Sequence, residues 1–254
     1  MGSSRRRLLN QSTHAWLAGR APLDLIVTMD DASSEIYSAF LVEEEGTMSS
    51  FSGLLAVIAE QGLPCALYTD RASHCFHTPE AGGKVDKSKL TQVGRALDRL
   101  GIEHIPAYSP EARGRSERAF ATLQDRLVKE LALAAIATVE AANRFIAETY
   151  LPDHNTRFAR PPEVPESVFV PTTRAQVEDI LRHQEARQVG NDNTVRYHGR
   201  ILQIPEHDHC PHVVKARVRV HEYPDGTLAV FHGPRRLARF SAQGRPIDTK
   251  NLAA

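Results

Sequence analysis

The sequence predicts an α/β fold with a mixed sheet, followed by a small all-β unit, and three features carry this prediction. The first 150 residues or so alternate short apolar runs with amphipathic segments of helical spacing. Pro161, Pro162 and Pro165 then mark a Pro-rich, irregular stretch typical of a linker. Beyond it, short alternating runs are separated by turn signals, as in a small antiparallel barrel or sandwich.

Apolar, β-branched runs predict strands at residues 23–29 and 35–42, joined as a hairpin by the turn-forming residues Asp30–Ser34. Apolar residues at helical spacing predict a helix over 48–61, which Gly62 and Pro64 end. The same criteria predict strands at 65–69 and 102–106 and helices at 90–100, 116–133 and 139–150. This order of elements is typical of an α/β core with a mixed sheet.

The C-terminal part has a different pattern. Thr173 is a candidate N-cap for a short helix over residues 175–185. Strands are predicted at 194–197, 200–204, 216–223 and 228–231, with turn signals at His198-Gly199 and Pro224-Asp225-Gly226. We therefore divide the chain into a core at 5–152, a linker with a short helix at 153–186, a small β-barrel at 187–242 and a tail at 243–254.

Composition excludes several classes of protein. The chain is 41% hydrophobic and 24% charged, as in ordinary globular proteins. No apolar run approaches the roughly 20 residues of a membrane span, so no membrane partner is expected. The basic start of the chain lacks the apolar stretch of a signal peptide. Three cysteines, odd in number and far apart, do not form a disulfide pattern, which favours a reducing, cytoplasmic setting.

Charge is balanced overall but unevenly placed. From Thr172 onward there are 13 Lys and Arg against 9 Asp and Glu, and the preceding residues carry 18 against 22. A basic C-terminal part beside an acidic body suits a nucleic-acid partner and a carboxylate-rich site. A difference of this size is also common among proteins that bind nothing anionic.

The most informative segment runs from Tyr108 to Leu127. It resembles the block S-P-x-x-x-G-x-x-E-R of DDE transposases and integrases, which an aromatic residue and T-L follow. The matching residues are Ser109, Pro110, Gly114, Glu117, Arg118, Phe120, Thr122 and Leu123. In those families the Glu of this block is the third catalytic carboxylate and opens a helix. The segment Leu67–Asp70, with Phe76, resembles the strand end that carries the second catalytic Asp.

The N-terminal segment is similar to that of ISNCY-type insertion-sequence transposases, in which D-G-S-x-H precedes the matching residues Ala15-Trp16-Leu17. This chain reads Asn10-Gln11-Ser12-Thr13-His14, so Asn10 occupies the position of the first catalytic Asp. Asp30–Ser33 resembles the D-D-A-[ST] hairpin that follows. Further similar segments, Asn155–Ala159 and Glu222–Gly226 among them, extend the resemblance over nearly the whole chain.

The resemblance implies an RNase-H-like catalytic core, an SH3-like C-terminal barrel and DNA transposition by end cleavage and strand transfer. It implies catalytic roles at Asn10, Asp70 and Glu117, and metal ligation by Asp70 and Glu117. Two Mg²⁺ or Mn²⁺ ions about 4 Å apart would activate the nucleophile and stabilise the leaving 3′-oxygen. Hard oxygen ligands suit such ions. Double-stranded DNA, both transposon ends and target, is the expected partner, with a homo-oligomer and no nucleotide cofactor.

Asn10 makes enzymatic activity an open question. Its amide oxygen can ligate a metal, but the bridging negative charge is lost. Three interpretations remain: an inactivated copy, an engineered variant or a misassigned register. We favour the first, partly because the chain lacks the N-terminal helix-turn-helix region of such transposases. The alternative function is a catalytically inactive remnant that binds DNA or self-associates. An RNA-directed nuclease is less favoured, because it requires neither the Glu117 block nor the barrel.

Two basic groups are candidate DNA contacts. Arg113, Arg115 and Arg118 flank Glu117 and could bind phosphates, or form an ordinary exposed helix face. In the barrel the candidates are Lys215, Arg217, Arg219, Arg235, Arg236 and Arg239. Alternating arginines on an antiparallel strand are equally typical of a plain solvent-exposed face.

Two His/Cys groups could suggest zinc sites. The first is His74, Cys75 and His77, and the second is His207, His209, Cys210 and His212. Neither has the paired spacing of a structural zinc site, so we expect ordinary loop residues in both.

Overall fold

The structure is a computed structural model of the 254-residue chain. It describes residues 7–80, 83–108, 110–161, 169–206 and 212–247. Contacts divide the chain into two compact units, Met1–Ile180 and Leu181–Ala254. The predicted boundaries after 152 and 186 stay predictions.

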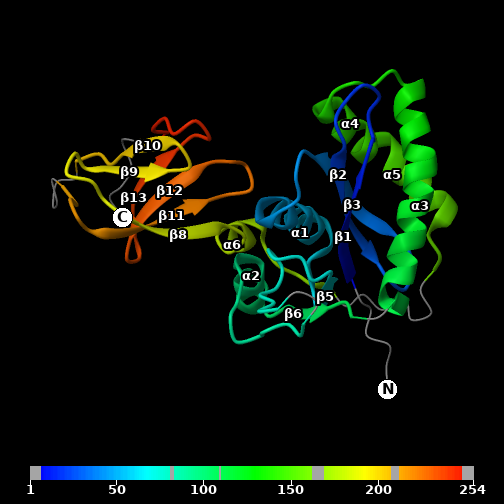
Figure 1. Ribbon diagram of the computed structural model, residues 1–254, viewed down its shortest axis with the longest axis horizontal. Helices are drawn as coiled ribbons and strands as arrows, with labels where there is room; N and C mark the ends of the chain where they lie inside the picture. The colour runs from blue at the N-terminus through cyan, green and yellow to red at the C-terminus, as the bar shows by residue number, and fades with distance from the viewer. Residues whose placement is uncertain (1–6, 81–82, 109, 162–168, 207–211, 248–254) are drawn as a thin grey trace. The chain divides into compact units, whose positions relative to one another are not determined.

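The first unit is built on a five-stranded sheet in the order β3-β2-β1-β5-β6 (Figure 1). Its strands are β1 (Arg7–His14), β2 (Leu23–Asp30), β3 (Ile36–Val42), β5 (Ala66–Thr69) and β6 (Glu103–Pro106). β1 pairs antiparallel with β2, and β2 with β3. β5 runs parallel to both β1 and β6. The predicted α/β core with a mixed sheet is therefore confirmed.

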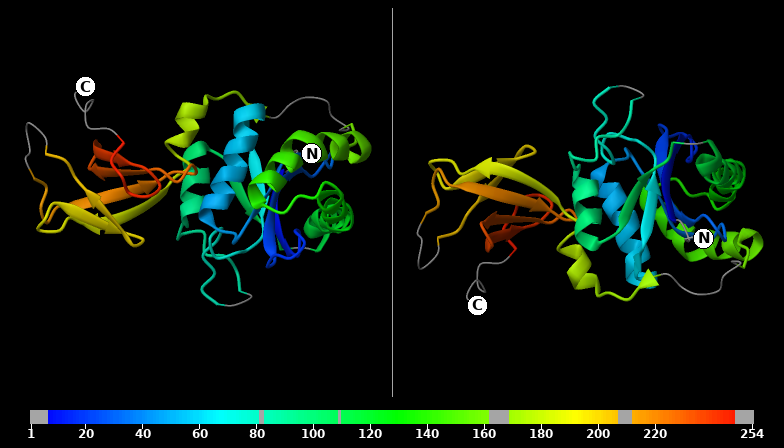
Figure 2. Two further views of the ribbon diagram at one scale, coloured as in Figure 1. Left: turned by 90° about the horizontal axis from the view of Figure 1, so that it is seen from above. Right: turned by 90° about the horizontal axis from the view of Figure 1, so that it is seen from below.

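Helices cover both faces of this sheet (Figures 1 and 2). α1 (Thr47–Gln61) and α2 (Gln92–Leu100) lie on one face, and α3 (Pro110–Leu133) and α4 (Val139–Phe145) on the other. Every residue of β2 is buried, as expected of a central strand covered on both faces. None of the helices in the described residues is long and apolar enough to cross a membrane.

The helix predicted over 139–150 is longer than expected. α4 continues through a π-helical turn, η1 (Ile146–Tyr150), into α5 (Leu151–Phe158). A proline inside a helix lacks an N–H donor and clashes with the carbonyl four residues earlier, which ordinarily ends or kinks the helix. The wider π turn directly before Pro152 absorbs this clash. Residues 153–158 are consequently helix rather than linker.

The helix predicted over 175–185 is wrong in its second half. α6 spans only Arg174–Glu178, and β8 (His183–Gln188) follows as a strand. β8 pairs with β11 (Arg217–Glu222), from His183 opposite Glu222 to Gln188 opposite Arg217. Pairing with a distant strand thus overrides local propensity. A short pair, β4 (Leu63–Pro64) with β7 (Phe169–Val170), completes the first unit's strands among the described residues.

The second unit is all-β in its described residues. A four-stranded antiparallel sheet has the order β13-β12-β11-β8, and β9 pairs with β10. The remaining strands are β9 (Thr194–Tyr197), β10 (Arg200–Gln203), β12 (Leu228–His232) and β13 (Arg235–Phe240). Val218, Val220 and Phe240 lie in its apolar core. β13 escaped prediction because arginines interrupt its apolar residues. The SH3-like form of this unit stays a prediction.

Candidate active site

Two of the three predicted site residues belong to neighbouring parallel strands: Asn10 lies on β1, the middle strand of the sheet, and Asp70 directly follows β5. In the register of β1 with β5, Leu8 is opposite Tyr68 and Leu9 is opposite Thr69. Asn10 is the next residue on β1, and Asp70 is the first residue after the end of β5. Because parallel strands advance together, these two side chains reach the same level of the sheet.

The Asn10 side chain belongs to the sheet face that α3 covers. Leu8 packs in one apolar cluster with Leu123 and Leu127 of α3. Ser12 accepts a 2.9 Å hydrogen bond at its Oγ from Nε2 of Gln124, also on α3. Residues two apart on a strand point to the same face, so Asn10, between Leu8 and Ser12, faces α3.

The same alternation applies to β5. Tyr68 packs against the cluster that contains the α3 leucines. Asp70 lies two residues further on, just past the end of β5, and continued alternation along the strand would direct its side chain to the same face. Its Oδ1 accepts a 3.0 Å hydrogen bond from the backbone N–H of Ala72, which fixes the carboxylate at the start of the following turn.

Glu117 completes the group from the side of α3. It precedes Gln124 by seven residues, or about two helical turns, and therefore shares the face of α3 that contacts β1. Glu117 is exposed, so its carboxylate is accessible to solvent. The pairing register and the helix face thus bring Asn10, Asp70 and Glu117 to one side of the sheet.

The strand end that carries Asp70 is held by a buried polar pair. The Thr69 hydroxyl donates to the carbonyl of Asp70 at 3.0 Å and lies 2.9 Å from Nε2 of His104. Burial, with a smaller contribution from Lys87, lowers the pKa of His104 to about 4. The imidazole is therefore neutral at pH 7. Because the Thr69 hydrogen is already used, His104 donates from Nε2 to the hydroxyl oxygen.

One acidic residue near the site was not predicted. Glu45 follows β3, and its backbone N–H donates to Oδ2 of Asp24 at 2.8 Å. Burial raises the pKa of the Glu45 carboxyl to about 7, and the negative charges of Asp70 and Asp24 raise it further. The sequence signal was the acidic run Glu43–Glu45 before α1, but its proximity to Asp70 arises only in the folded chain.

We expect Glu45→Gln to stabilise the protein above neutral pH. The unfolded chain loses this proton near the ordinary pKa of 4.5 and the folded chain near 7, so folding stability falls as pH rises between these values. One pKa unit is worth about 1.4 kcal/mol. Allowing for solvent screening, the variant should gain about 1–2 kcal/mol in free energy of unfolding at pH 8.

Urea unfolding in EDTA, followed by the fluorescence of the single, fully buried Trp16, measures this effect at pH 8 and pH 4.5. Exposed Glu44 supplies the matched control, Glu44→Gln. A gain that is equal at both pH values would contradict the raised pKa of Glu45 in the folded protein.

The donor set offers hard oxygen ligands of the kind that Mg²⁺ and Mn²⁺ prefer. Asp70 and Glu117 supply carboxylates, and Asn10 supplies an amide oxygen. Among the described residues, no three His, Cys, Asp or Glu side chains group closely enough to hold a metal ion. Burial is the main cause of the raised pKa of Glu45, the negative charges of Asp70 and Asp24 add to it, and a divalent cation beside Asp70 would offset this second contribution. The donors therefore fit a divalent ion but lack one charged ligand.

The predicted DNA-contact residues fall in both units. Arg118 is exposed on α3, whereas the side chains of Arg113 and Arg115 lie outside the described residues. In the second unit Arg217 and Arg219 are exposed on β11 and alternate with buried valines. Lys215 lies just before β11 with a positive φ of 62°. Their role in binding DNA stays a prediction.

The first His/Cys group consists of His74, Cys75 and His77, and the thiol of Cys75 is buried. Burial raises the pKa of Cys75 to about 12, so this thiol is protonated at pH 7. A protonated thiol is a poor metal ligand. In the second group, His207, His209 and Cys210 lie outside the described residues.

Sequence comparison finds similarity to transposases. The chain is 32% identical over 225 residues to a protein of Sinorhizobium fredii (strain NBRC 101917 / NGR234) that is named as a transposase, y4bF. This match covers 87% of the chain and 49% of the relative. The transposase for insertion sequence IS1202 of Streptococcus pneumoniae is 30% identical over 193 residues, covering 76% of the chain and 41% of that protein. No protein-family model matches the chain.

Solved structures similar to the chain include retroviral integrases. The HTLV-2 integrase catalytic core in complex with magnesium is 17% identical, with a TM-score of 0.41 over 57% of this chain and 87% of that one. A chain from the structure of a simian T-cell lymphotropic virus intasome in complex with PP2A regulatory subunit B56 gamma is 17% identical, with a TM-score of 0.44 over 89% of this chain and 72% of that one. By sequence, the chain is similar to transposases over most of its own length, and it spans about half the length of the curated relatives it matches.

Proposed function

We propose that this chain carries the RNase-H-like catalytic core of a DDE-type DNA transposase of the ISNCY-type group. One observation carries the proposal: the register of β1 with β5 sets Asn10 level with Asp70, on the face where α3 contributes Glu117. These positions were assigned from sequence motifs alone. Their meeting on one face of the sheet supports the assigned register, and the similarity to transposases supports the reaction class.

The reaction is cleavage of a DNA phosphodiester at a transposon end, followed by attack of the freed 3′-OH on target DNA. Divalent ions, two in active members of the family, would supply Lewis acidity and orient the attacking oxygen. This chain's own contribution is the placement of the carboxylates of Asp70 and Glu117 and the amide of Asn10. The buried pair of Thr69 and His104 keeps the Asp70 strand end in position.

We expect Asn10 to impair this reaction, because its side chain is an uncharged metal ligand. An amide presents one acceptor oxygen and one donor NH₂ group, and it has no net charge. Mg²⁺ demands near-ideal octahedral coordination, so a site that lacks one charged ligand should bind it poorly. Mn²⁺ accepts mixed nitrogen and oxygen ligands more readily than Mg²⁺ does. It is therefore the better ion for detecting residual activity.

A second candidate function rests on the same residue. With an uncharged group at position 10, the chain could occupy DNA, or associate with other copies, without cutting. The exposed arginines on α3 and β11 would serve either function, because phosphate contacts need no catalysis.

Nicking of supercoiled plasmid DNA separates the two functions. We expect the unaltered chain to nick slowly with Mn²⁺, and both Asp70→Asn and Glu117→Gln to abolish nicking, because each removes a charged ligand from the proposed site. Asp125→Asn is the matched control on α3, since Asp125 is exposed and pairs only with Lys129 in the described residues.

DNA binding of each variant is measured in EDTA on the same preparations. Nicking lost in Asp70→Asn and Glu117→Gln and kept in Asp125→Asn supports the enzyme. DNA binding by all four proteins with no nicking by any of them would favour the inactive, DNA-binding function.

A further inference from the structure

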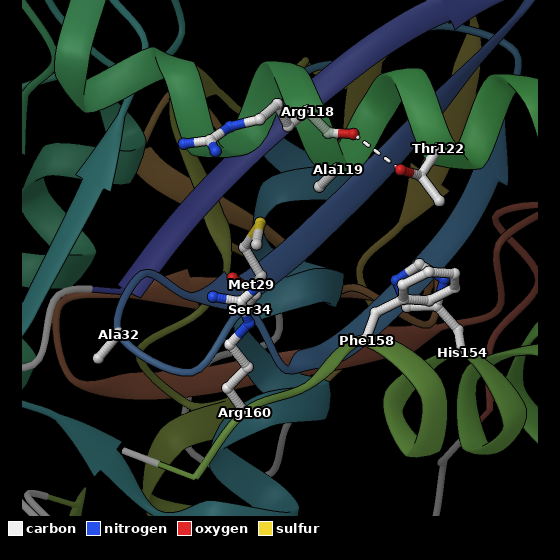
Figure 3. A pocket seen from close by; sticks show the side chains of 9 residues that line it. All are labelled: Met29, Ala32, Ser34, Arg118, Ala119, Thr122, His154, Phe158 and Arg160. Atoms are coloured by element: carbon white, nitrogen blue, oxygen red, sulfur yellow. Dashed lines mark hydrogen bonds between the residues drawn. The ribbon is translucent and has the colours of Figure 1, made fainter. Parts of the chain in front are cut away.

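A cavity of about 430 Å³ opens beside the amino-terminal half of α3 (Figure 3). Its walls come from the tip of the β2–β3 hairpin, from α3 and from the end of α5, and they include Ser34, Arg118, His154, Phe158 and Arg160. Arg118 directly follows Glu117, so the cavity adjoins the candidate active site along α3. Nothing in the chemistry of the Asp70 and Glu117 carboxylates requires this cavity.

Two guanidinium groups dominate its electrostatics. Arg118 reaches in from α3 and Arg160 from the opposite wall, with Met29 and Ser34 between them (Figure 3). The described residues that line the cavity include no carboxylate. Arg160 is exposed, and no ion pair involves it within the described part of the chain. Two guanidinium groups therefore line a cavity whose described walls supply no carboxylate.

The wall that carries Arg160 is held by backbone and side-chain hydrogen bonds. The Arg160 backbone N–H donates to the Ser33 carbonyl at 2.8 Å, which fixes the chain after α5 against the hairpin. The buried Asp30 carboxylate accepts from the Ala32 N–H at 3.2 Å and from the Ser33 hydroxyl at 3.1 Å. The Asp30 carboxylate is therefore hydrogen-bonded within the hairpin, and the Arg160 side chain takes no part in these contacts.

A buried polar group also lines the cavity. His154 is only 4% exposed, and its Nδ1 has no hydrogen-bond partner among the described residues. Its ring packs between Tyr150 and Phe158, at centroid distances of 5.6 and 4.8 Å. Burial, with the nearby Arg126, lowers the pKa of His154, so the imidazole is neutral and can donate one hydrogen bond. His154 lies beside Phe158, away from the two arginines (Figure 3), and forms an uncharged part of the cavity wall.

We propose that this cavity binds a phosphate group of the DNA backbone between Arg118 and Arg160, next to the scissile region. Guanidinium forks match phosphate oxygens in pairs, and the Ser34 hydroxyl between them can donate to the same group. Contacts of this kind set the position of a duplex without reading its sequence. The inference rests on the proposed function, since it takes DNA as the substrate.

Salt dependence of DNA binding tests the site without catalysis. Affinity for duplex DNA is measured in EDTA at several salt concentrations for the unaltered chain, for Arg160→Gln and for the control Arg157→Gln. Arg157 lies in the last turn of α5, three residues before Arg160, and is paired with Asp153 at 2.9 Å. Loss of one phosphate contact should reduce the slope of log K against log salt by roughly 0.9. We expect this reduction in Arg160→Gln and none in Arg157→Gln.

Inorganic phosphate distinguishes a DNA site from a site for a free anion. Thermal unfolding of the unaltered chain and of Arg160→Gln is recorded with increasing phosphate, and the unliganded melting curves check that the variant folds. A lower salt slope in Arg160→Gln supports the inference. An unchanged slope overturns it, and phosphate stabilisation that Arg160→Gln loses would then assign the cavity to a free anion.

The outcome is independent of nicking. A lower slope in a protein that never nicks DNA keeps the phosphate site and removes the proposed catalysis. An unchanged slope in a protein whose nicking depends on Glu117 removes the phosphate site and keeps the catalysis. Absence of any DNA binding overturns the phosphate site.

Discussion

Asn10→Asp is expected to raise Mg²⁺-dependent nicking of duplex DNA by roughly 100-fold or more. The substitution restores a charged oxygen ligand level with Asp70, on the face that α3 covers with Glu117. Metal-ion stabilisation of a developing charge is worth several kcal/mol, and about 1.4 kcal/mol corresponds to a tenfold change in rate. The gain should be larger with Mg²⁺ than with Mn²⁺, because Mg²⁺ is less tolerant of an incomplete ligand set.

The double variant Asn10→Asp/Glu117→Gln is the decisive control, since it keeps the new charge but removes a carboxylate from the facing helix. It should return to the background rate. If the unaltered chain already cuts as fast as Asn10→Asp, the first carboxylate must be sought elsewhere, at Asp24, Asp30 or Asp31. Two of these have their oxygens engaged: Asp24 with Thr13 and the Glu45 N–H, and Asp30 with Ala32 and Ser33.

The same comparison bears on the three interpretations of Asn10. A misassigned register would set the residue at position 10 away from Asp70, whereas β1 and β5 bring the two to one level. The structure therefore favours a substitution at the predicted position over an error in alignment.

Strands with continuous apolar runs were predictable from local sequence, because burial on both faces of a sheet requires such runs. β2 and β3 are of this kind. β1 is not: after Leu9 its residues are polar, and no periodicity identifies it as a strand. Its polar face carries Asn10 and contacts α3 through Ser12. Local sequence did not predict this strand, and only the family resemblance singled out Asn10. A central strand that carries site residues departs from the apolar pattern for that reason.

Other parts of the site depend on contacts between distant segments. Glu45 lies near Asp70 because β3 and β5 end at the same edge of the sheet, 25 positions apart in sequence. The cavity beside α3 needs Arg160, which α5 brings to the hairpin only because the helix continues past Pro152. Because the sequence predicted a linker from residue 153 onward, it gave no position for Arg160 relative to the hairpin.

The segment Asn155–Ala159 was part of the family resemblance without a stated role, and the structure assigns one to Asn155. β3 is the edge strand of the sheet, so its outer backbone groups have no neighbouring strand. The Ile36 N–H donates to Oδ1 of Asn155, and Nδ2 of Asn155 donates to the Ile36 carbonyl, both at 2.9 Å. Asn143 makes the same pair of bonds with Leu41, at 2.6 and 3.0 Å. Two side-chain amides thus replace the missing strand.

Asn155→Ala is therefore expected to lower the free energy of unfolding by roughly 2–4 kcal/mol, because it leaves the N–H and the carbonyl of buried Ile36 without partners. Urea unfolding monitored by Trp16 fluorescence measures the loss, with exposed Thr156→Ala as the neighbouring control.

Asn155→Asp tests the same pair of hydrogen bonds through its dependence on pH. Its carboxylate can accept from the Ile36 N–H but repels the Ile36 carbonyl, whereas the protonated acid can donate to it. The Asp variant should thus recover stability relative to Asn155→Ala as pH falls through the carboxyl pKa. Equal stability of the two variants at all pH values would mean that the amide does not bridge the edge of β3, which would then be open to pairing with other chains.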